Sequence, residues 1–167
     1  VVQKTASISP ISLICVLFKK FMNLIAEIRK KAAATKRNIV LPEGMEERTI
    51  KAAQDVVSND FAVPILLGDE ATIAQKAKEL GVDASTLQII NPATADDLQE
   101  YVKIYADMRA EKGKPIAEED ALKLMQDPLY YGAMMVNQGK AEGTLAGAIH
   151  ATGAVITAAA RVIGTKP

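Results

Sequence analysis

Hydrophobic and polar residues follow two alternating spacings along this chain, and the alternation is clear from Met22 onward. Residues 22–37 carry apolar side chains three and four positions apart, which is typical of a helix with one buried face. Basic residues gather at the end of this segment, where they suit the negative end of a helix dipole. The run NIVLP at residues 38–42 is short, apolar and closed by proline, so it predicts a buried strand.

The same two patterns then alternate to the end of the chain. We predict further strands at residues 61–68, 87–92 and 143–148. We predict helices at residues 45–59, 71–80, 95–113, 116–126 and 128–140, and a last helix from Thr152. The boundary residues that support these assignments are the candidate N-caps Asp69, Thr94 and Asp127, the first-turn Pro128, and the helix-ending Gly81. Strands that alternate with helices predict an α/β fold, with three α/β/α layers around a mainly parallel sheet.

Composition is that of an ordinary globular domain. The 167 residues are enough for one domain or for part of a larger one, and 49% of them are apolar. Because 20 basic residues balance 20 acidic ones, we expect no nucleic-acid partner. Cys15 is the only cysteine, which excludes an internal disulfide and a cysteine-rich zinc site and fits a reducing, cytoplasmic location.

Residues 1–21 differ from the rest of the chain. They contain three lysines and no acidic residue, whereas the other residues carry 17 basic and 20 acidic side chains. Their apolar run ISLICVLF is much shorter than the roughly 20 residues of a membrane-spanning helix, and the small-residue cleavage site of a secretory signal is absent. We interpret residues 1–21 as an extension outside the fold and expect no membrane partner. A membrane or export role and an added structural segment are the alternatives.

Two predicted strands end in sequences that could form a ligand site, because ligands bind at the carboxyl ends of strands in such sheets. LPEGMEER at residues 41–48 contains a turn glycine and Arg48, which forms either an ion pair on a helix surface or part of a cleft. AGAIHATG at residues 146–153 contains His150, the only histidine, and a helix start at Thr152, whose free N–H groups favour anions. His150 is either a hydrogen-bonded structural residue or a ligand contact.

Other common sites lack the residues that they need. The chain has neither a Walker loop nor a G-x-G-x-x-G fingerprint. One histidine and no carboxylates paired at ligand spacing argue against a metal site, and no nucleophile elbow is present for a Ser–His–acid triad. Arg109, near the end of its predicted helix, is either a solvated cation or a phosphate ligand that uses its planar fork of donors.

Five stretches of the sequence, in this order, resemble the amino-terminal half of phosphate acetyltransferase (phosphotransacetylase), in the wider phosphate acetyl/butyryltransferase family. They are IVLPEGMEERTIKAA, PILLGDEATI, MRAEKG, DPLYYGAMMVNQGKAEGTLAGA and the H-A-T-G before the last helix. The resemblance covers residues 22–167. It implies an isocitrate/isopropylmalate-dehydrogenase-like fold, with two α/β domains on either side of a cleft, and a homodimer of the full-length protein.

The resemblance also implies a reaction: reversible transfer of an acetyl group between coenzyme A and inorganic phosphate. Acetyl-CoA and phosphate are then substrates, no cofactor is bound permanently, and no metal takes part directly. In this family an aspartate of the carboxyl-terminal half deprotonates the CoA thiol. We therefore expect no catalytic residue in residues 22–167, which would form the amino-terminal domain of a truncated two-domain acyltransferase that is inactive alone.

Four residues take binding positions through the resemblance. Arg109 matches the family arginine of the R-x-x-K-G run, which contacts CoA or phosphate, and His150 and Thr152 match the loop before the last helix. A second family arginine is replaced here by Thr157, so Arg161, one helical turn later on the same face, is the candidate to reach the same anion. We expect Arg109 and the His150 turn to share one hollow.

Two alternatives to the acetyltransferase remain at this point. Within the family, phosphate butyryltransferase and related acyltransferases have similar motifs, so the sequence leaves the acyl chain open. In a different class, a non-catalytic α/β module would have the same fold without the reaction, and the threonine in place of the second family arginine favours it.

Overall fold

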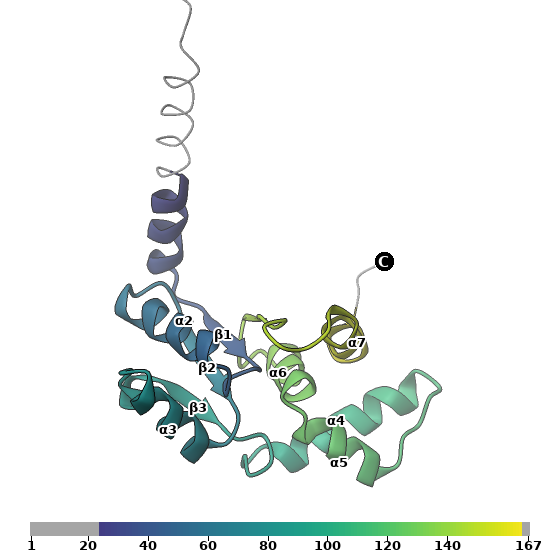
Figure 1. The fold of residues 1–167 in the computed structure, drawn as a ribbon. Helices are drawn as coiled ribbons and strands as arrows, with labels where there is room; N and C mark the ends of the chain where they lie inside the picture. Colours follow the sequence, from purple (N-terminus) through teal and green to yellow (C-terminus); the bar gives the residue numbers. More distant parts are fainter. Residues whose placement is uncertain (1–23, 165–167) are drawn as a thin grey trace, which may run out of the picture.

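The computed structural model describes residues 24–164, and a sheet of four parallel strands lies at its centre. The strands lie in the spatial order β3-β2-β1-β4 and are β1 (Asn38–Leu41), β2 (Val63–Leu67), β3 (Gln88–Ile90) and β4 (Gly143–Thr144). Residues 24–34 form a helix that extends away from the rest of the molecule (Figure 1). The proposed extension, residues 1–21, lies outside the described residues.

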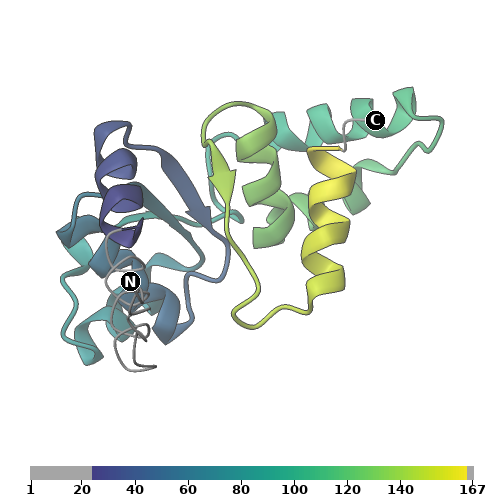
Figure 2. The same cartoon turned by 90° about the horizontal axis from the view of Figure 1, so that it is seen from above.

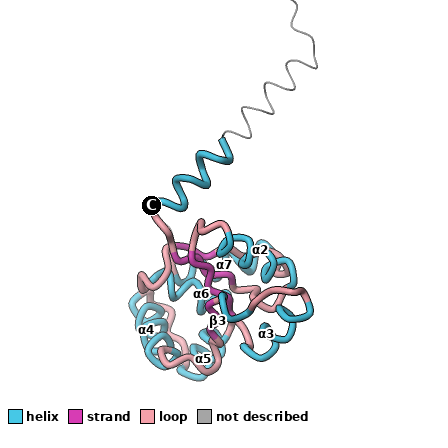
Figure 3. The backbone as a smooth tube through the Cα atoms, turned by 90° about the vertical axis from the view of Figure 1, so that its left-hand side faces the viewer, coloured by secondary structure: helices cyan, strands magenta, loops and turns pink. Residues whose placement is uncertain are grey.

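Helices cover both faces of this sheet (Figure 3). On one face are α2 (Glu47–Ser58) and α3 (Glu70–Glu79), and the 3-10 turn η1 (Ala84–Thr86) leads into β3. The other side of the sheet carries α4 (Leu98–Glu111), α5 (Glu118–Gln126), α6 (Pro128–Asn137) and α7 (Thr152–Val162). Of these, α6 contacts the strands, and α5 and α7 pack against it. The predicted α/β fold with a parallel sheet is confirmed.

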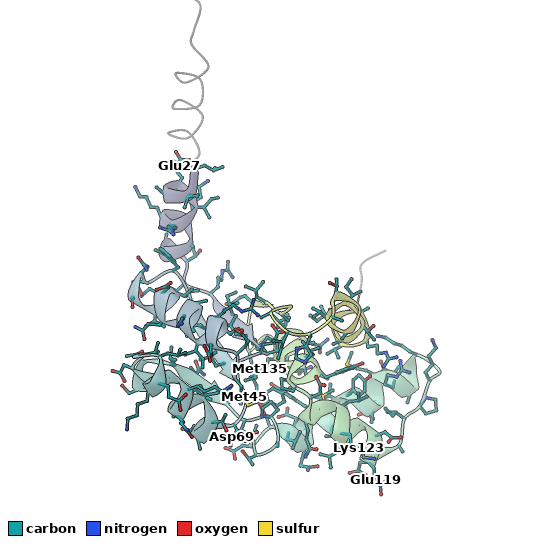
Figure 4. All side chains as sticks on the ribbon, in the orientation of Figure 1. Glu27, Met45, Asp69, Glu119, Lys123 and Met135 are labelled. Carbon is teal, nitrogen blue, oxygen red and sulfur yellow. The ribbon has the colours of Figure 1, made fainter. Side chains whose placement is uncertain are left out.

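The strands divide the core into two halves because successive side chains of a strand point to opposite faces. Val40, Ile65 and Leu67 pack with the buried residues of α4, α5, α6 and α7. Leu41 and Leu66 pack on the other face, with α2 and α3. The outer side of α5 carries Glu119 and Lys123, which face away from the sheet (Figure 4).

Gly44 brings the end of β1 close to the end of β2. Its backbone N–H donates a hydrogen bond of 3.2 Å to the carbonyl oxygen of Leu67. A Cβ atom at this position would lie 2.6 Å from that oxygen, so the close approach requires glycine. The turn thereby fixes the path of residues 42–46 between β1 and α2.

The helix predicted at 95–113 begins three residues later than expected, and Thr94 does not cap it. The N-terminal residue Asp97 makes no side-chain cap bond, because its carboxylate binds elsewhere. It accepts a hydrogen bond from the Tyr131 hydroxyl and forms a 2.7 Å ion pair with Lys140. Burial raises the pKa of Asp97, but these two bonds outweigh it and lower the pKa overall. Asp97 therefore ties the start of α4 to α6 and to the approach to β4.

The strand predicted at residues 143–148 is also shorter than expected. Only Gly143 and Thr144 pair with β1, and the last ladder contact is the 2.9 Å bond from Leu145 N–H to the carbonyl of Val40. Beyond it the backbone turns at Gly147, whose φ of 116° belongs to a region that side chains rarely adopt. The prediction of strand for residues 145–148 was wrong, and these residues form a loop instead.

Candidate functional site at the carboxyl ends of β1 and β4

The order of the sheet reverses at β1. From β1 the chain proceeds to β2 and β3 on one side, and it then crosses to β4 on the other side of β1. In open α/β sheets, ligands bind at the carboxyl ends of strands at such a reversal. Here the two segments at that position are residues 42–46 after β1 and residues 145–151 after β4. Figure 2 shows the second segment leading from β4 into α7, which lies beside α6.

A buried carboxylate joins these two segments. The Glu43 side chain is only 3% exposed. Its Oε2 accepts hydrogen bonds from the N–H groups of Gly147 (2.9 Å) and Ala148 (2.6 Å). Its Oε1 accepts hydrogen bonds from the N–H groups of Ile149 (2.9 Å) and His150 (2.7 Å), and lies 2.9 Å from His150 Nδ1. Successive N–H groups that converge in this way form a concave binding site for an anion.

The electrostatics of Glu43 follow from this arrangement. Burial by itself raises the pKa of the carboxyl group, because it penalises the charged form. The hydrogen bonds from His150, Ile149 and Ala148 outweigh burial and lower the pKa from 4.5 to about 2. Glu43 is therefore a carboxylate at neutral pH, and its charge is stabilised mainly by backbone N–H groups, with the Arg48 guanidinium as an added favourable charge.

This carboxylate changes the interpretation of the closing loop. The small residues of AGAIHATG suggested backbone N–H groups open to an external anion. In the structure, four of these N–H groups instead donate hydrogen bonds to the Glu43 carboxylate. Within residues 24–164, the N–H groups of Thr152 and Gly153, at the start of α7, make no hydrogen bond. Thr152 is exposed there, and so is Ala151, whose N–H group also makes no hydrogen bond in these residues, so the start of α7 still offers donors to an anion.

Arg48 binds the loop of residues 145–151 through the carbonyl of Ala148. Its Nε forms a 2.7 Å ion pair with Glu46, and its terminal nitrogen donates a 2.9 Å hydrogen bond to the carbonyl of Ala148. Two hollows flank the guanidinium. One, of about 230 Å³, is lined in part by Glu43 and Leu145. The other, of about 570 Å³, is lined by Met45, Glu46, Glu47, Arg48, Lys76 and Ile149. Arg48 thus forms the ion pair considered for it, whereas its place in a cleft stays a prediction.

The two remaining candidate arginines lie on α4 and α7. Arg161, near the end of α7, donates a 3.0 Å hydrogen bond to the hydroxyl of Tyr130. Tyr130 packs edge-on against Tyr105, with ring centroids 6.2 Å apart. Burial raises the pKa of Tyr105, and the positive charges of Arg109 and Arg161 oppose that rise. Arg109 Nε is buried without a hydrogen-bond partner in the described residues.

The predicted binding residues of α7 lie at two places along the helix. The backbone of His150 and Thr152 lies at the start of α7, whereas that of Arg161 lies nine residues along the helix from Thr152, about 14 Å away at 1.5 Å per residue. A common hollow for Arg109 and the His150 turn stays a prediction. Thr157, midway along α7, donates a 2.6 Å hydrogen bond to the carbonyl of Gly153 in its own helix.

Apolar side chains next to the loop face solvent. Leu145 is 68% exposed, Ile149 66% and Ile156, on α7, 61%. The buried side of α7 is formed by Ala158 and Val162. Large apolar side chains that gather around a polar site are typical of a surface that another element covers.

The described part of the chain shows neither a metal site nor a membrane-spanning helix. Among residues 24–164, no three His, Cys, Asp or Glu side chains lie close enough together to hold a metal ion. No helix in this range is both long enough and apolar enough to cross a bilayer.

Comparison with known proteins identifies the family. The family described as "Phosphate acetyl/butaryl transferase" matches residues 23–167. The chain belongs to this family. Two phosphate acetyltransferases are similar to it: that of Staphylococcus aureus (strain MRSA252), 39% identical over 145 residues, and that of Nitratidesulfovibrio vulgaris, 42% identical over 138 residues. The resemblance stated from the sequence is confirmed.

Two solved structures share the fold. The EutD phosphotransacetylase from Staphylococcus aureus superimposes with a TM-score of 0.79 at 38% identity, and a phosphotransacetylase from Streptococcus pyogenes with a TM-score of 0.81 at 32% identity. Each match covers 87% of this chain, but only 43% and 44% of the respective structures. The match to the Staphylococcus aureus (strain MRSA252) relative covers 87% of this chain and 43% of that relative. The match to the Nitratidesulfovibrio vulgaris relative covers 83% of this chain and 19% of that relative. The chain therefore spans less than half the length of these family members.

Sequence reasoning missed one residue of this site, Glu43. The only signal was its place in the run LPEG, where a lone carboxylate stands between proline and glycine directly after a buried strand. A charged residue is almost never fully buried without a partner, so burial at this position implies a dedicated set of donors. Those donors come from residues more than 100 positions later, which the local sequence does not indicate.

Proposed function

We propose that this chain is the amino-terminal part of a phosphate acetyltransferase. The reaction is acetyl-CoA plus phosphate to acetyl phosphate plus CoA, in either direction. The observation that carries this proposal is the 39% identity to the Staphylococcus aureus phosphate acetyltransferase over 145 residues, accompanied by the same fold in a phosphotransacetylase structure. Coenzyme A is a substrate here rather than a resident cofactor.

The reaction needs positive or N–H groups at two points. A phosphate oxygen attacks the thioester carbonyl carbon, the carbon–sulfur bond breaks, and CoA leaves as a thiolate that takes up a proton. Groups that face phosphate and the developing oxyanion stabilise the transition state. In this chain the candidates are the N–H groups at the start of α7, the Thr152 hydroxyl beside them, and the side chains of Arg109 and Arg161.

The candidate groups suit a long substrate that contacts several points of the site. The backbone of Arg161 lies about 14 Å along α7 from that of Thr152, and its guanidinium binds the hydroxyl of Tyr130. CoA carries phosphates at one end and the thiol at the other, so a single molecule can reach both. We propose that Arg109 and Arg161 bind a phosphate group of CoA and that the α7 start faces the reacting end.

We propose that the carboxyl-terminal half of the full-length enzyme supplies the catalytic base. The exposed side chains of Leu145, Ile149 and Ile156 support this division, because they form an apolar margin beside the loop. The same proposal includes three further parts. Residues 22–167 form a domain that is one wall of a cleft, the full-length enzyme is a homodimer, and its location is cytoplasmic.

An activity assay tests the division between the halves. Residues 22–167 and a version extended by the carboxyl-terminal half of the Staphylococcus aureus relative are compared for CoA release from acetyl-CoA and phosphate, with butyryl-CoA as the second substrate. We expect release only from the extended version, and faster release with acetyl-CoA. In the extended version, Arg109→Ala should raise KM for acetyl-CoA, whereas Lys114→Ala, at an exposed lysine nearby, should not. Activity in residues 22–167 alone would contradict the proposal.

A non-catalytic module is the second candidate, and one observation favours it. Thr157 replaces a family arginine and turns its hydroxyl back to the carbonyl of Gly153, so it offers no cation to an anion. Thr157→Arg in the extended version distinguishes the two. A gain in activity of tenfold or more would show that the arginine position still faces the reaction, whereas inactivity of both versions together with no CoA binding would support the module.

A further inference from the structure

Within residues 24–164, the His150 ring is held through one nitrogen only. Nδ1 lies 2.9 Å from Glu43 Oε1, and the same oxygen accepts the backbone N–H of His150 at 2.7 Å. Ring and backbone are thus fixed to one atom, which leaves the imidazole little freedom to rotate. In the described residues Nε2 makes no hydrogen bond, and the side chain is 32% exposed.

The charge of Glu43 decides which nitrogen carries the proton. An ionised carboxylate can only accept hydrogen bonds, so the group that faces it must be a donor. Nδ1 therefore carries hydrogen, and in a neutral imidazole Nε2 is then a lone pair. A free imidazole favours the opposite arrangement, with hydrogen on Nε2, so the contact with Glu43 reverses the usual preference.

We propose that Glu43 is a positioning residue that holds His150 as the Nδ1–H tautomer and presents the Nε2 lone pair to the substrate as a hydrogen-bond acceptor. The assignment of a substrate rests on the proposed function. An acceptor is complementary to a donor, such as the thiol or an amide N–H of CoA. It does not suit a phosphate oxygen, which is itself an acceptor. His150 thereby serves CoA rather than phosphate, although it lies beside the N–H groups at the start of α7.

The wild-type chain provides a direct measurement, because it contains a single histidine. With 15N-labelled histidine, a long-range 1H–15N spectrum of the full chain at pH 8 shows one pair of ring nitrogens. We expect Nδ1 to have the chemical shift of a protonated nitrogen and Nε2 that of an unprotonated one. Hydrogen on Nε2, or shifts averaged between the two tautomers, would overturn the proposal without any variant.

Two variants separate positioning from mere support of the loop. In Glu43→Gln the side-chain NH2 group can face Gly147 and Ala148, and the amide oxygen can then still accept a hydrogen bond from Nδ1. We therefore expect a less stable protein with the same tautomer. In Glu43→Leu no acceptor remains, and we expect the signals to change to the Nε2–H form. Glu111→Gln, at an exposed glutamate of α4, is the matched control and should leave both ring signals unchanged.

The substrate is tested with two probes, CoA and inorganic phosphate, added to the same labelled chain. We expect CoA to move the Nε2 signal more than the Nδ1 signal, and phosphate to leave Nε2 in its acceptor state. A phosphate-induced proton on Nε2, or no change with either probe, would overturn the assignment of Nε2 to CoA. The tautomer result is independent of that outcome and of any acyl-transfer assay, so this inference and the proposed function can fail separately.

Discussion

Glu43→Gln is the most informative change for the stability of the closing loop. The wild-type carboxylate accepts four backbone N–H groups and the His150 ring with two oxygens. A glutamine has one acceptor oxygen, and its NH2 group must face backbone N–H groups that need an acceptor. The variant therefore removes the charge and leaves at least two part-buried backbone N–H groups without the acceptor that Glu43 provides, while side-chain volume stays nearly the same.

The structure gives the size of this effect. Glu43 has a pKa of about 2 in the folded chain against 4.5 as the ordinary value, and each pKa unit corresponds to about 1.4 kcal/mol. The charge of Glu43 therefore stabilises the fold by about 3 kcal/mol at neutral pH. The unpaired N–H groups cost a further 1 kcal/mol or more, roughly. We expect the free energy of unfolding at pH 7 to fall by about 3–5 kcal/mol.

The pH dependence has a definite sign. The folded pKa is below the unfolded one, so the unfolded chain takes up a proton first as the pH falls. The contribution of Glu43 is complete above about pH 5.5, declines as the pH falls past 4.5, and is absent once the pH is below the folded value of about 2. Glutamine does not titrate, so the difference between wild type and variant should shrink steadily from pH 5.5 to pH 3.

Urea denaturation followed by circular dichroism, at several pH values between 3 and 7, measures this difference. Glu111→Gln, which changes an exposed glutamate in the same way, should alter the unfolding free energy by less than about 0.5 kcal/mol. A loss below about 1 kcal/mol at pH 7, or a difference that does not vary with pH, would refute the role assigned to the Glu43 charge.

Three further predictions use the same denaturation assay. Gly147→Ala should destabilise the chain by about 1–2 kcal/mol, because φ is 116° there and a side chain would strain the backbone. Gly153→Ala, in α7 with open space around it, should stabilise the chain by about 0.5 kcal/mol. Equal effects of the two variants would contradict the backbone strain proposed at Gly147. Asp97→Asn should lower the free energy of unfolding by about 2 kcal/mol, since it breaks the ion pair with Lys140. Asp96→Asn, at an exposed residue, should change it little. Similar losses for the two variants would contradict the stabilising role of Asp97. Gly44→Ala should cost more than about 3 kcal/mol, because a Cβ would lie 2.6 Å from a backbone oxygen of β2, and a fully stable variant would show that this approach can relax.

Local patterns predicted the elements well where local chemistry decides them. Asp127 caps α6 and Pro128 begins it, as their sequence predicted, because both effects act within one helical turn. Asp69 caps α3 in the same way. The start of α4 was wrong because the carboxylate of Asp97 is bound by Tyr131 and Lys140, which are distant in sequence.

The binding residues were predicted in kind but not in arrangement. The resemblance selected Arg109, His150, Thr152 and Arg161, and their ligand contacts remain predictions. The tertiary structure links Arg161 to two tyrosines, since its guanidinium donates to the hydroxyl of Tyr130, which packs against Tyr105. A sequence-based match of motifs carries no distances, so it could not show this contact.

The sequence by itself determined the alternation of strands and helices, the family, and the caps at Asp69 and Asp127, because spacing, propensity and capping act between neighbours in the chain. Only the tertiary structure decided that β4 pairs with β1, and that the loop after it closes on Glu43, 104 to 107 residues away. A buried charge must find its donors wherever the fold brings them, and that choice is made by packing across the sheet rather than by adjacent residues.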